Sequence, residues 1–148
     1  MLAARHIFAP RKPERLALLL LQGVIALNAV GGAVYGLAGA EAVPREWLEG
    51  TPFRSYLVPS LILLIGVGGG MAFAGILSLR DSIRAPEAAM AAGLVLVGWI
   101  SVQVVVIVPE GGFSWLQPTM LVAGLLVFWL GLRLRRPRAR GETQVDAR

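Results

Sequence analysis

The side chains best placed for chemistry in this 148-residue sequence are a tryptophan and a few amides set within long apolar runs. Trp99 and Gln103 are four residues apart, so both lie on one face of a predicted helix and can face one space. Asn28 lies near the middle of another run, and Gln117 opens the last one. An amide in hydrocarbon costs free energy unless it is hydrogen-bonded, so we expect Asn28 and Gln103 to point inward. Two hypotheses follow: these amides bond helices to each other, or they line a small cavity.

Aromatic and polar residues are mixed in the two loops nearest to Gln103, residues 44–56 and 109–118. Trp and Tyr collect at bilayer interfaces for physical reasons alone, and interfacial anchoring explains much of this pattern. The Glu, Arg, Gln and Ser residues among them favour a lid that contacts a lipid headgroup or an apolar small molecule. Arg54 is a candidate partner for a lipid phosphate. The predicted ligand-binding residues are Trp47, Phe53, Arg54, Tyr56, Trp99, Gln103, Trp115 and Gln117.

Signatures of catalysis are missing from the sequence. There is no cysteine, which excludes disulfides, thiol catalysis and thiolate metal sites. His6 is the single histidine, so a haem held by two histidines of one chain is impossible. No phosphate-binding loop, dinucleotide fingerprint or Ser–His–Asp set is present. We therefore expect no enzymatic activity, no catalytic residues, no metal site and no cofactor.

Four apolar runs must position these residues, and they cover residues 16–39, 57–79, 88–108 and 118–132. A bilayer core of roughly 30 Å needs about 20 helical residues. The first three runs are long enough; the fourth spans only if residues 113–116 dip into the interface or Arg133 and Arg135 snorkel. Only 16% of residues are charged, which argues against a soluble enzyme. The predicted fold is all-α: a polytopic membrane protein with four transmembrane helices in an up-down bundle.

The basic residues predict the orientation of this bundle. Twelve of the 14 fall in the two tails and the middle loop, and only Arg45 and Arg54 lie on the other side. The positive-inside rule therefore places both termini in the cytoplasm. The predicted domains are a basic N-tail 1–15, a transmembrane domain 16–132 and a basic C-tail 133–148. The same rule, together with attraction to anionic headgroups, explains the basic pI of 11.0, so we expect membrane lipids and no nucleic acid as partners.

Small residues predict where the helices pack. Gly32 and Gly36 are followed by Ala40, and Gly66 and Gly70 by Ala74, at intervals of four. Such rows let helix backbones approach closely in lipid. We expect Gly32, Gly36, Gly66 and Gly70 to pack the first two helices together, or alternatively to form the contact of a homo-oligomer. Gly68 is expected to matter less, and Pro59 to kink the second helix.

The strings WLEGTPFRSYLVP (47–59), WI and Q (99–103) and SWLQP (114–118) resemble an uncharacterised family of small four-helix bacterial integral membrane proteins. The resemblance covers most of residues 16–132. It implies a multi-pass protein of the bacterial cytoplasmic (inner) membrane and brings no activity or site. The leading functional hypothesis is a non-enzymatic protein that binds a lipid, an apolar ligand or a partner at its outer half. The alternatives are a small oligomeric transporter or channel, and an accessory subunit of a larger membrane complex.

Overall fold

A computed structural model describes residues 12–49, 51–107 and 112–135, and every regular element in these ranges is helical. Most of the two predicted basic tails lies outside the described residues. The elements are α1 (Lys12–Leu37), the 3₁₀ turn η1 (Arg45–Leu48), α2 (Leu57–Ile62), the π-helical η2 (Leu63–Gly69), α3 (Gly70–Leu79), α4 (Ala85–Ile107) and α5 (Leu116–Leu134). Because α2, η2 and α3 follow one another without a break, they form one long helix. The all-α prediction is confirmed, with four helices long and apolar enough to cross a membrane.

The last of these helices is longer than the sequence predicts. It runs for 19 residues, or about 28 Å at the α-helical rise, where the apolar run has 15. The apolar run was cut short by Gln117 at one end and Arg133 at the other, yet both residues are helical. The apolar run keeps its 15 residues, and the helix gains its length from Leu116 and Gln117 at one end and from Arg133 and Leu134 at the other, because a polar residue ends an apolar run without ending the helix.

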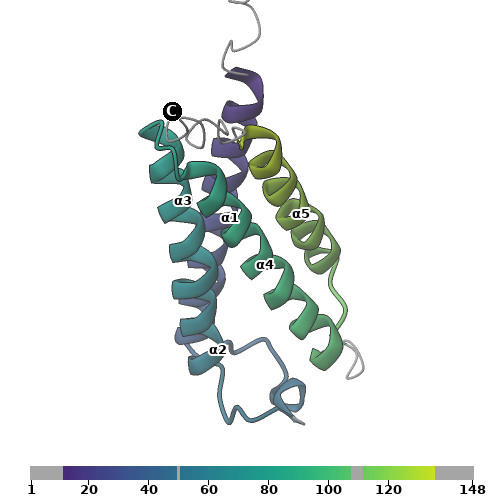
Figure 1. The fold of residues 1–148 in the computed structure, drawn as a ribbon. Coiled ribbons are helices and arrows are strands. Elements are labelled where there is room, and N and C mark those ends of the chain that lie inside the picture. The colour runs from purple at the N-terminus through teal and green to yellow at the C-terminus, as the bar shows by residue number, and fades with distance from the viewer. Residues whose placement is uncertain (1–11, 50, 108–111, 136–148) are drawn as a thin grey trace, which may run out of the picture.

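Figure 1 shows the four long helices running alternately up and down. The start of α1, the end of α3, the start of α4 and the end of α5 meet at one end, here called the basic end. The η1 loop and the start of α5 lie at the other, here called the loop end. Helix α4 packs along α5 and against α3 and η2, and it diverges from α2 toward the loop end (Figure 1). The bundle is therefore closed at the basic end and splayed at the loop end.

The core is a narrow apolar seam between the helices. Its largest fully buried side chains include Leu18, Ile25, Met71 and Leu96, and the rest are mainly small. The core cluster consists of Leu18, Ile25, Ala29, Val67, Met71, Ala74, Ala89, Ala92, Leu96, Ile100, Val127 and Leu130. The many alanines keep the helix axes close, as packing without a hydrophobic driving force requires.

Glycines bring the backbones of α4 and α5 closer together than those of any other helix pair for which a glycine contact is seen in the described chain. A Cβ on Gly93 would lie 2.8 Å from the Gly124 carbonyl oxygen and 2.9 Å from the Phe128 nitrogen. A Cβ on Gly131 would lie 2.9 Å from the carbonyl oxygen of Pro86. These are backbone atoms, which cannot move aside as a side chain can. The sequence contained the signal: Gly93 ends a row of small residues at intervals of four, which starts at Ala85.

The predicted packing glycines divide into two groups. Gly36 and Gly32 do pack α1 against the second helix, since a Cβ on Gly36 would overlap the Ser60 hydroxyl and one on Gly32 would lie 3.2 Å from Leu63 Cδ2. On the second helix, a Cβ on Gly70 meets nothing within 4 Å, and one on Gly66 only just reaches Val95 at 4.0 Å.

Gly68 does face α1, and a Cβ added there would lie 3.5 Å from the Ala29 Cβ. For the single chain, the expected packing role of Gly70 and the lesser role of Gly68 are therefore wrong. Spacing identifies a row of small residues but not which side of the helix meets a neighbour.

Pro59 also differs from its expected role. The second helix begins at Leu57, so Pro59 lies in its first turn, where a missing N–H breaks no intrahelical bond. The helical irregularity comes later, as the π-helical segment η2. The expected proline kink is therefore wrong, because Pro59 lies in the first turn of the helix.

Charged side chains tie the basic end together. The Arg15 guanidinium donates to the Ser78 carbonyl at 2.7 Å and to the Leu79 carbonyl at 3.2 Å, and it pairs with Asp81 at 2.7 Å. It thus adds hydrogen bonds to carbonyls at the C-terminal end of α3, where the helix dipole also favours a cation. Arg133 stacks 4.2 Å from the Trp129 ring centroid and lies 3.9 Å from Glu14. These contacts connect α1 with α3 and with α5.

The glycine contact yields a paired test on one helix. Gly93→Ala places a Cβ against backbone atoms of α5 and should lower the free energy of unfolding by about 1–3 kcal/mol. Gly98, also on α4, is exposed and has open space around its Cβ position. Gly98→Ala should therefore be neutral or stabilise by up to about 1 kcal/mol through helix propensity. Thermal unfolding in detergent measures both, and equal effects would contradict the α4–α5 assignment.

Candidate functional site

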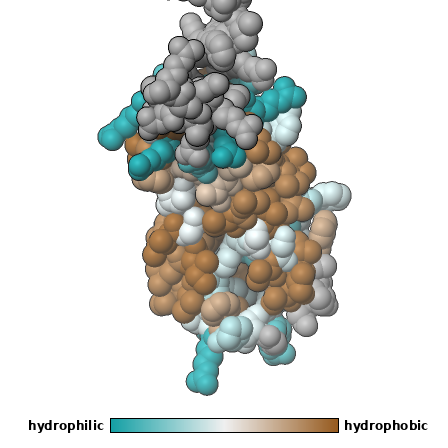
Figure 2. All heavy atoms as spheres, viewed as in Figure 1, coloured by the Kyte–Doolittle hydropathy of each residue, from teal (hydrophilic) through white to brown (hydrophobic). Residues whose placement is uncertain are grey.

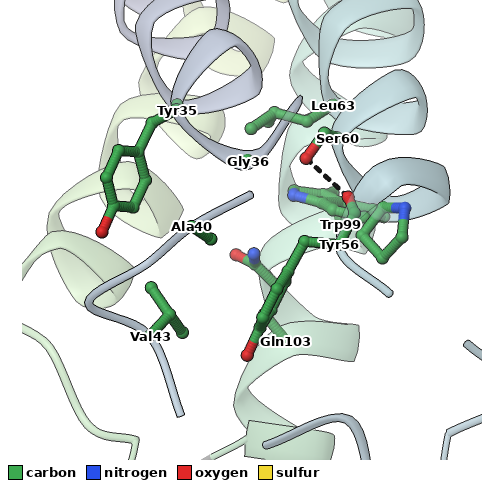
Figure 3. Close-up of a pocket in the computed structure, with 11 residues that line it drawn as sticks. Tyr35, Gly36, Ala40, Val43, Tyr56, Ser60, Leu63, Trp99 and Gln103 are labelled. Carbon is green, nitrogen blue, oxygen red and sulfur yellow. Dashed lines mark hydrogen bonds between the residues drawn. The ribbon is translucent and has the colours of Figure 1, made fainter. Parts of the chain in front are cut away.

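A pocket of about 130 Å³ lies at the loop end, where α4 diverges from α2. Its walls come from α1, α2, η2 and α4, and the chain between α1 and η1 lies over it (Figure 3). The lining residues are Gly32, Tyr35, Gly36, Ala40, Val43, Tyr56, Pro59, Ser60, Leu63, Trp99 and Gln103. None of them is ionisable near neutral pH, so the pocket is suited to an uncharged ligand.

Trp99 and Gln103 supply polar atoms to this pocket. They lie one turn apart on α4, and in Figure 3 the indole nitrogen and the amide both point toward the space beside α1. Trp99 Nε1 is buried and donates no hydrogen bond within the described chain. Gln103 lines the same pocket one turn nearer the loop end, and its side chain is half-buried. A buried donor left unpaired costs about 1–3 kcal/mol, so an acceptor placed in the pocket would recover that free energy.

Hydrogen bonds hold the wall and the overlying loop in place. The Ser60 hydroxyl donates to the Tyr56 carbonyl at 2.6 Å, and the Tyr56 hydroxyl donates to the Pro44 carbonyl at 2.6 Å. The Ala42 N–H donates to the Tyr35 hydroxyl at 3.1 Å. Burial, and then the nearby Glu46 charge, raise the pKa of Tyr56, so its hydroxyl keeps its proton and its bond to the loop.

The pocket ends in apolar side chains toward the basic end. One helical turn deeper than Gly32, Leu63 and Trp99 lie Ala29, Val67 and Leu96, and each of the three is at most 2% exposed. On the α1 side of the pocket, Gly32 and Tyr35 line the pocket and are also exposed at the surface. The pocket therefore opens at the surface along α1 and is closed below.

Three of the eight predicted ligand-binding residues line this pocket: Tyr56, Trp99 and Gln103. Trp47 and Phe53 are half-buried in the loop, and Arg54 is exposed beside them. None of these three lines the pocket. Tyr35, Val43 and Ser60 line it although they were not predicted; Ser60 has the clearest signal, as a small polar residue one turn after Tyr56.

The start of α5 does not reach the pocket. Trp115 is 80% exposed and meets Phe113 edge-to-face, with ring centroids 5.5 Å apart. Gln117 is buried, but it donates to the Gly112 carbonyl at 3.3 Å and accepts from the Ser114 N–H at 3.3 Å. Its amide thus holds the turn before α5, and Gln117 does not line the pocket with Gln103.

The amides of α1 are also placed differently from expectation. Asn28 is exposed, and its amide makes only a long contact of 3.8 Å to Met120 Sδ on α5. Gln22, which sequence reasoning missed, is the amide that points into the bundle. It is 1% exposed, it lies 3.8 Å from the Cβ position of Gly75, and neither of its amide atoms has a hydrogen-bond partner in the described chain. An isolated Gln within an apolar run was the available signal.

Metal binding has no support in the described ranges, which hold no group of three or more His, Cys, Asp or Glu residues able to share an ion. No family model, curated protein or solved structure matches the chain. The resemblance to small four-helix bacterial membrane proteins therefore carries no argument about the pocket, and its function must be inferred from its geometry.

Two buried glutamines allow a test with opposite expected signs. Gln22→Leu removes an amide that has no partner and should raise the free energy of unfolding by about 1 kcal/mol. Gln117→Leu removes an amide that bonds two backbone groups and should lower it by a similar amount. Thermal unfolding of both variants in the same detergent gives the comparison. A loss of stability in Gln22→Leu would show that its amide is satisfied, against the present assignment.

Proposed function

We propose that this chain is a non-enzymatic integral membrane protein that binds part of a lipid, or another uncharged apolar ligand, in the loop-end pocket. One observation carries the proposal: a buried indole N–H that has no hydrogen-bond partner in the described part of the chain faces a cavity whose lining has no charge. A site of this kind, mostly apolar with a few convergent polar groups, is typical of small-molecule binding.

The surface supports placement in a membrane. Only 28% of the most apolar window of each long helix is buried inside the protein. Large apolar side chains such as Leu27, Ile65 and Val105 are at least 70% exposed. Figure 2 shows hydrophobic residues around the middle of the molecule and hydrophilic ones at its two ends. A soluble monomer rarely exposes so much apolar surface, whereas a bilayer would cover it.

The charges support the orientation. Arg15, Arg80, Arg84, Arg133 and Arg135 lie at the basic end in the described chain, and the positive-inside rule places that end in the cytoplasm. The pocket then lies in the outer half of a bacterial cytoplasmic membrane, open toward the lipid along α1. The apolar closure below it favours binding over a transport path through the bundle. An oligomer or a larger complex would form on the exposed helix faces and is compatible with this pocket.

Orientation is tested with single cysteines, because the chain has none of its own. We expect Ser114→Cys, exposed at the loop end, to react with a membrane-impermeant thiol reagent added to intact cells. Ile83→Cys, which replaces an 88% exposed residue at the basic end, should react only after the membrane is opened. The reverse labelling pattern would overturn the orientation.

Binding is tested by filling the pocket. Val43 lines the pocket from the loop, so Val43→Phe should occupy part of its volume without disturbing the core. Native mass spectrometry of protein reloaded with dioleoyl phosphatidylcholine should show bound lipid falling several-fold. Val102→Phe, at a 57% exposed position of α4 outside the pocket, is the control and should retain lipid. Equal retention by the two variants would contradict binding at this site.

A further inference from the structure

We propose that the group held in the pocket is the ester carbonyl of a membrane lipid, with Trp99 Nε1 and the Gln103 amide donating hydrogen bonds to it. This inference rests on the proposed binding function and names the chemistry that the pocket recognises. It follows from the free hydrogen-bonding atoms, the charge of the lining, the depth of the two residues and the size of the space.

The first step is the direction of the free hydrogen bonds. An indole nitrogen can only donate, so the group that satisfies Trp99 Nε1 must be an acceptor. The Gln103 amide contributes a second donor one turn away. Two donors that converge on one space suit an oxygen with two lone pairs, which is what a carbonyl presents.

The second step is charge. A phosphate or carboxylate would bring a full charge into a pocket whose lining contains no cationic side chain. Arg45 and Arg54 are each two residues from a lining residue, and neither lines the pocket. The acceptor is therefore neutral, which excludes the lipid headgroup phosphate and leaves the ester oxygens that join the headgroup region to the acyl chains.

The third step is depth. Gln103 and Trp99 precede the end of α4 at Ile107 by four and eight residues, or about 6 Å and 12 Å along the helix axis. Helix α4 has 23 residues and is about 34 Å long, slightly more than a bilayer core of roughly 30 Å. Gln103 thus lies close to the boundary of the hydrocarbon region, where lipid esters lie, and Trp99 lies one turn deeper.

The fourth step is size and access. A volume of about 130 Å³ is far below the several hundred Å³ of a pocket that encloses a whole drug-sized ligand. It fits an ester group and the first few methylene groups of one chain. Because Gly32 and Tyr35 are exposed on the lining, the remainder of the lipid can stay in the bilayer beside α1.

The experiment compares two lipids that differ only in their two ester carbonyls. Full-length protein is reloaded with dioleoyl phosphatidylcholine or with the dialkyl ether analogue of the same headgroup and chain length. Retention of each lipid is then measured by native mass spectrometry. We expect the wild-type protein to retain the diester about three- to tenfold better, as the loss of one or two hydrogen bonds implies.

Two variants remove the donors. Trp99→Phe keeps a ring without the N–H, and Gln103→Leu keeps the side-chain volume without the amide; each should reduce the preference for the diester. Trp115→Phe changes an 80% exposed tryptophan outside the pocket and should leave that preference intact. Unfolding temperatures measured alongside show whether a variant has lost its fold. If one donor variant has unfolded, the diester preference of the other donor variant tests the assignment.

The outcomes separate this inference from the proposed function. If wild-type protein retains both lipids equally and Val43→Phe releases both, binding in the pocket stands and the ester assignment is overturned. If Trp99→Phe lowers retention of both lipids by the same factor, Trp99 supports the wall and recognises no carbonyl, which also overturns the assignment. If neither lipid is retained by the wild-type protein, the binding function itself fails.

Discussion

The close contact between α4 and α5 determines the shape of the rest of the bundle. Gly93, Gly124 and Gly131 allow the two backbones to touch, so α4 follows α5 rather than α2. A second helix pair forms where Gly36 of α1 meets Ser60 of α2. The two pairs join at the basic end, where Arg133 of α5 lies 3.9 Å from Glu14 of α1, and they separate toward the loop end. The pocket is the space that this separation leaves.

Polar side chains are paired at the basic end of the molecule, whereas some of those inside the bundle have no hydrogen-bond partner in the described chain. At the basic end, Arg15 and Asp81 pair with each other, and Arg133 lies between Trp129 and Glu14. Inside the bundle, Gln22 and Trp99 each bury hydrogen-bonding atoms that nothing in the described chain satisfies. The difference between them is space: Gln22 is packed against Gly75, whereas Trp99 faces a cavity. Of these two residues, Trp99 is therefore the one whose unsatisfied atom could reach the proposed ligand.

The sequence predicts the helices well because length and hydropathy are local properties. The second apolar run of the sequence and the second long helix of the structure have the same bounds, Leu57 to Leu79. The site is harder to predict because it depends on which faces meet. Spacing correctly brought Trp99 and Gln103 together, since both lie on one helix. Spacing could not reveal that the Gln117 amide forms its hydrogen bonds within the turn before α5. Nor could it reveal that Gly68 rather than Gly70 faces α1, because that depends on how two helices pack.

The glycine row of α1 connects stability with binding. Gly36 allows the second helix to approach α1, and together with Gly32 it also forms part of the pocket wall. The missing side chains that permit packing are thus the same ones that leave the cavity open. A larger residue in this row would displace Ser60 or Leu63, both of which also line the pocket, so packing and the pocket would change together. Trp99 and Gln103 lie across the cavity from that contact, on a helix held by α5 instead. Substitutions of Trp99 or Gln103 should therefore change the proposed recognition on α4 while the contact between Gly36 and Ser60 remains in place.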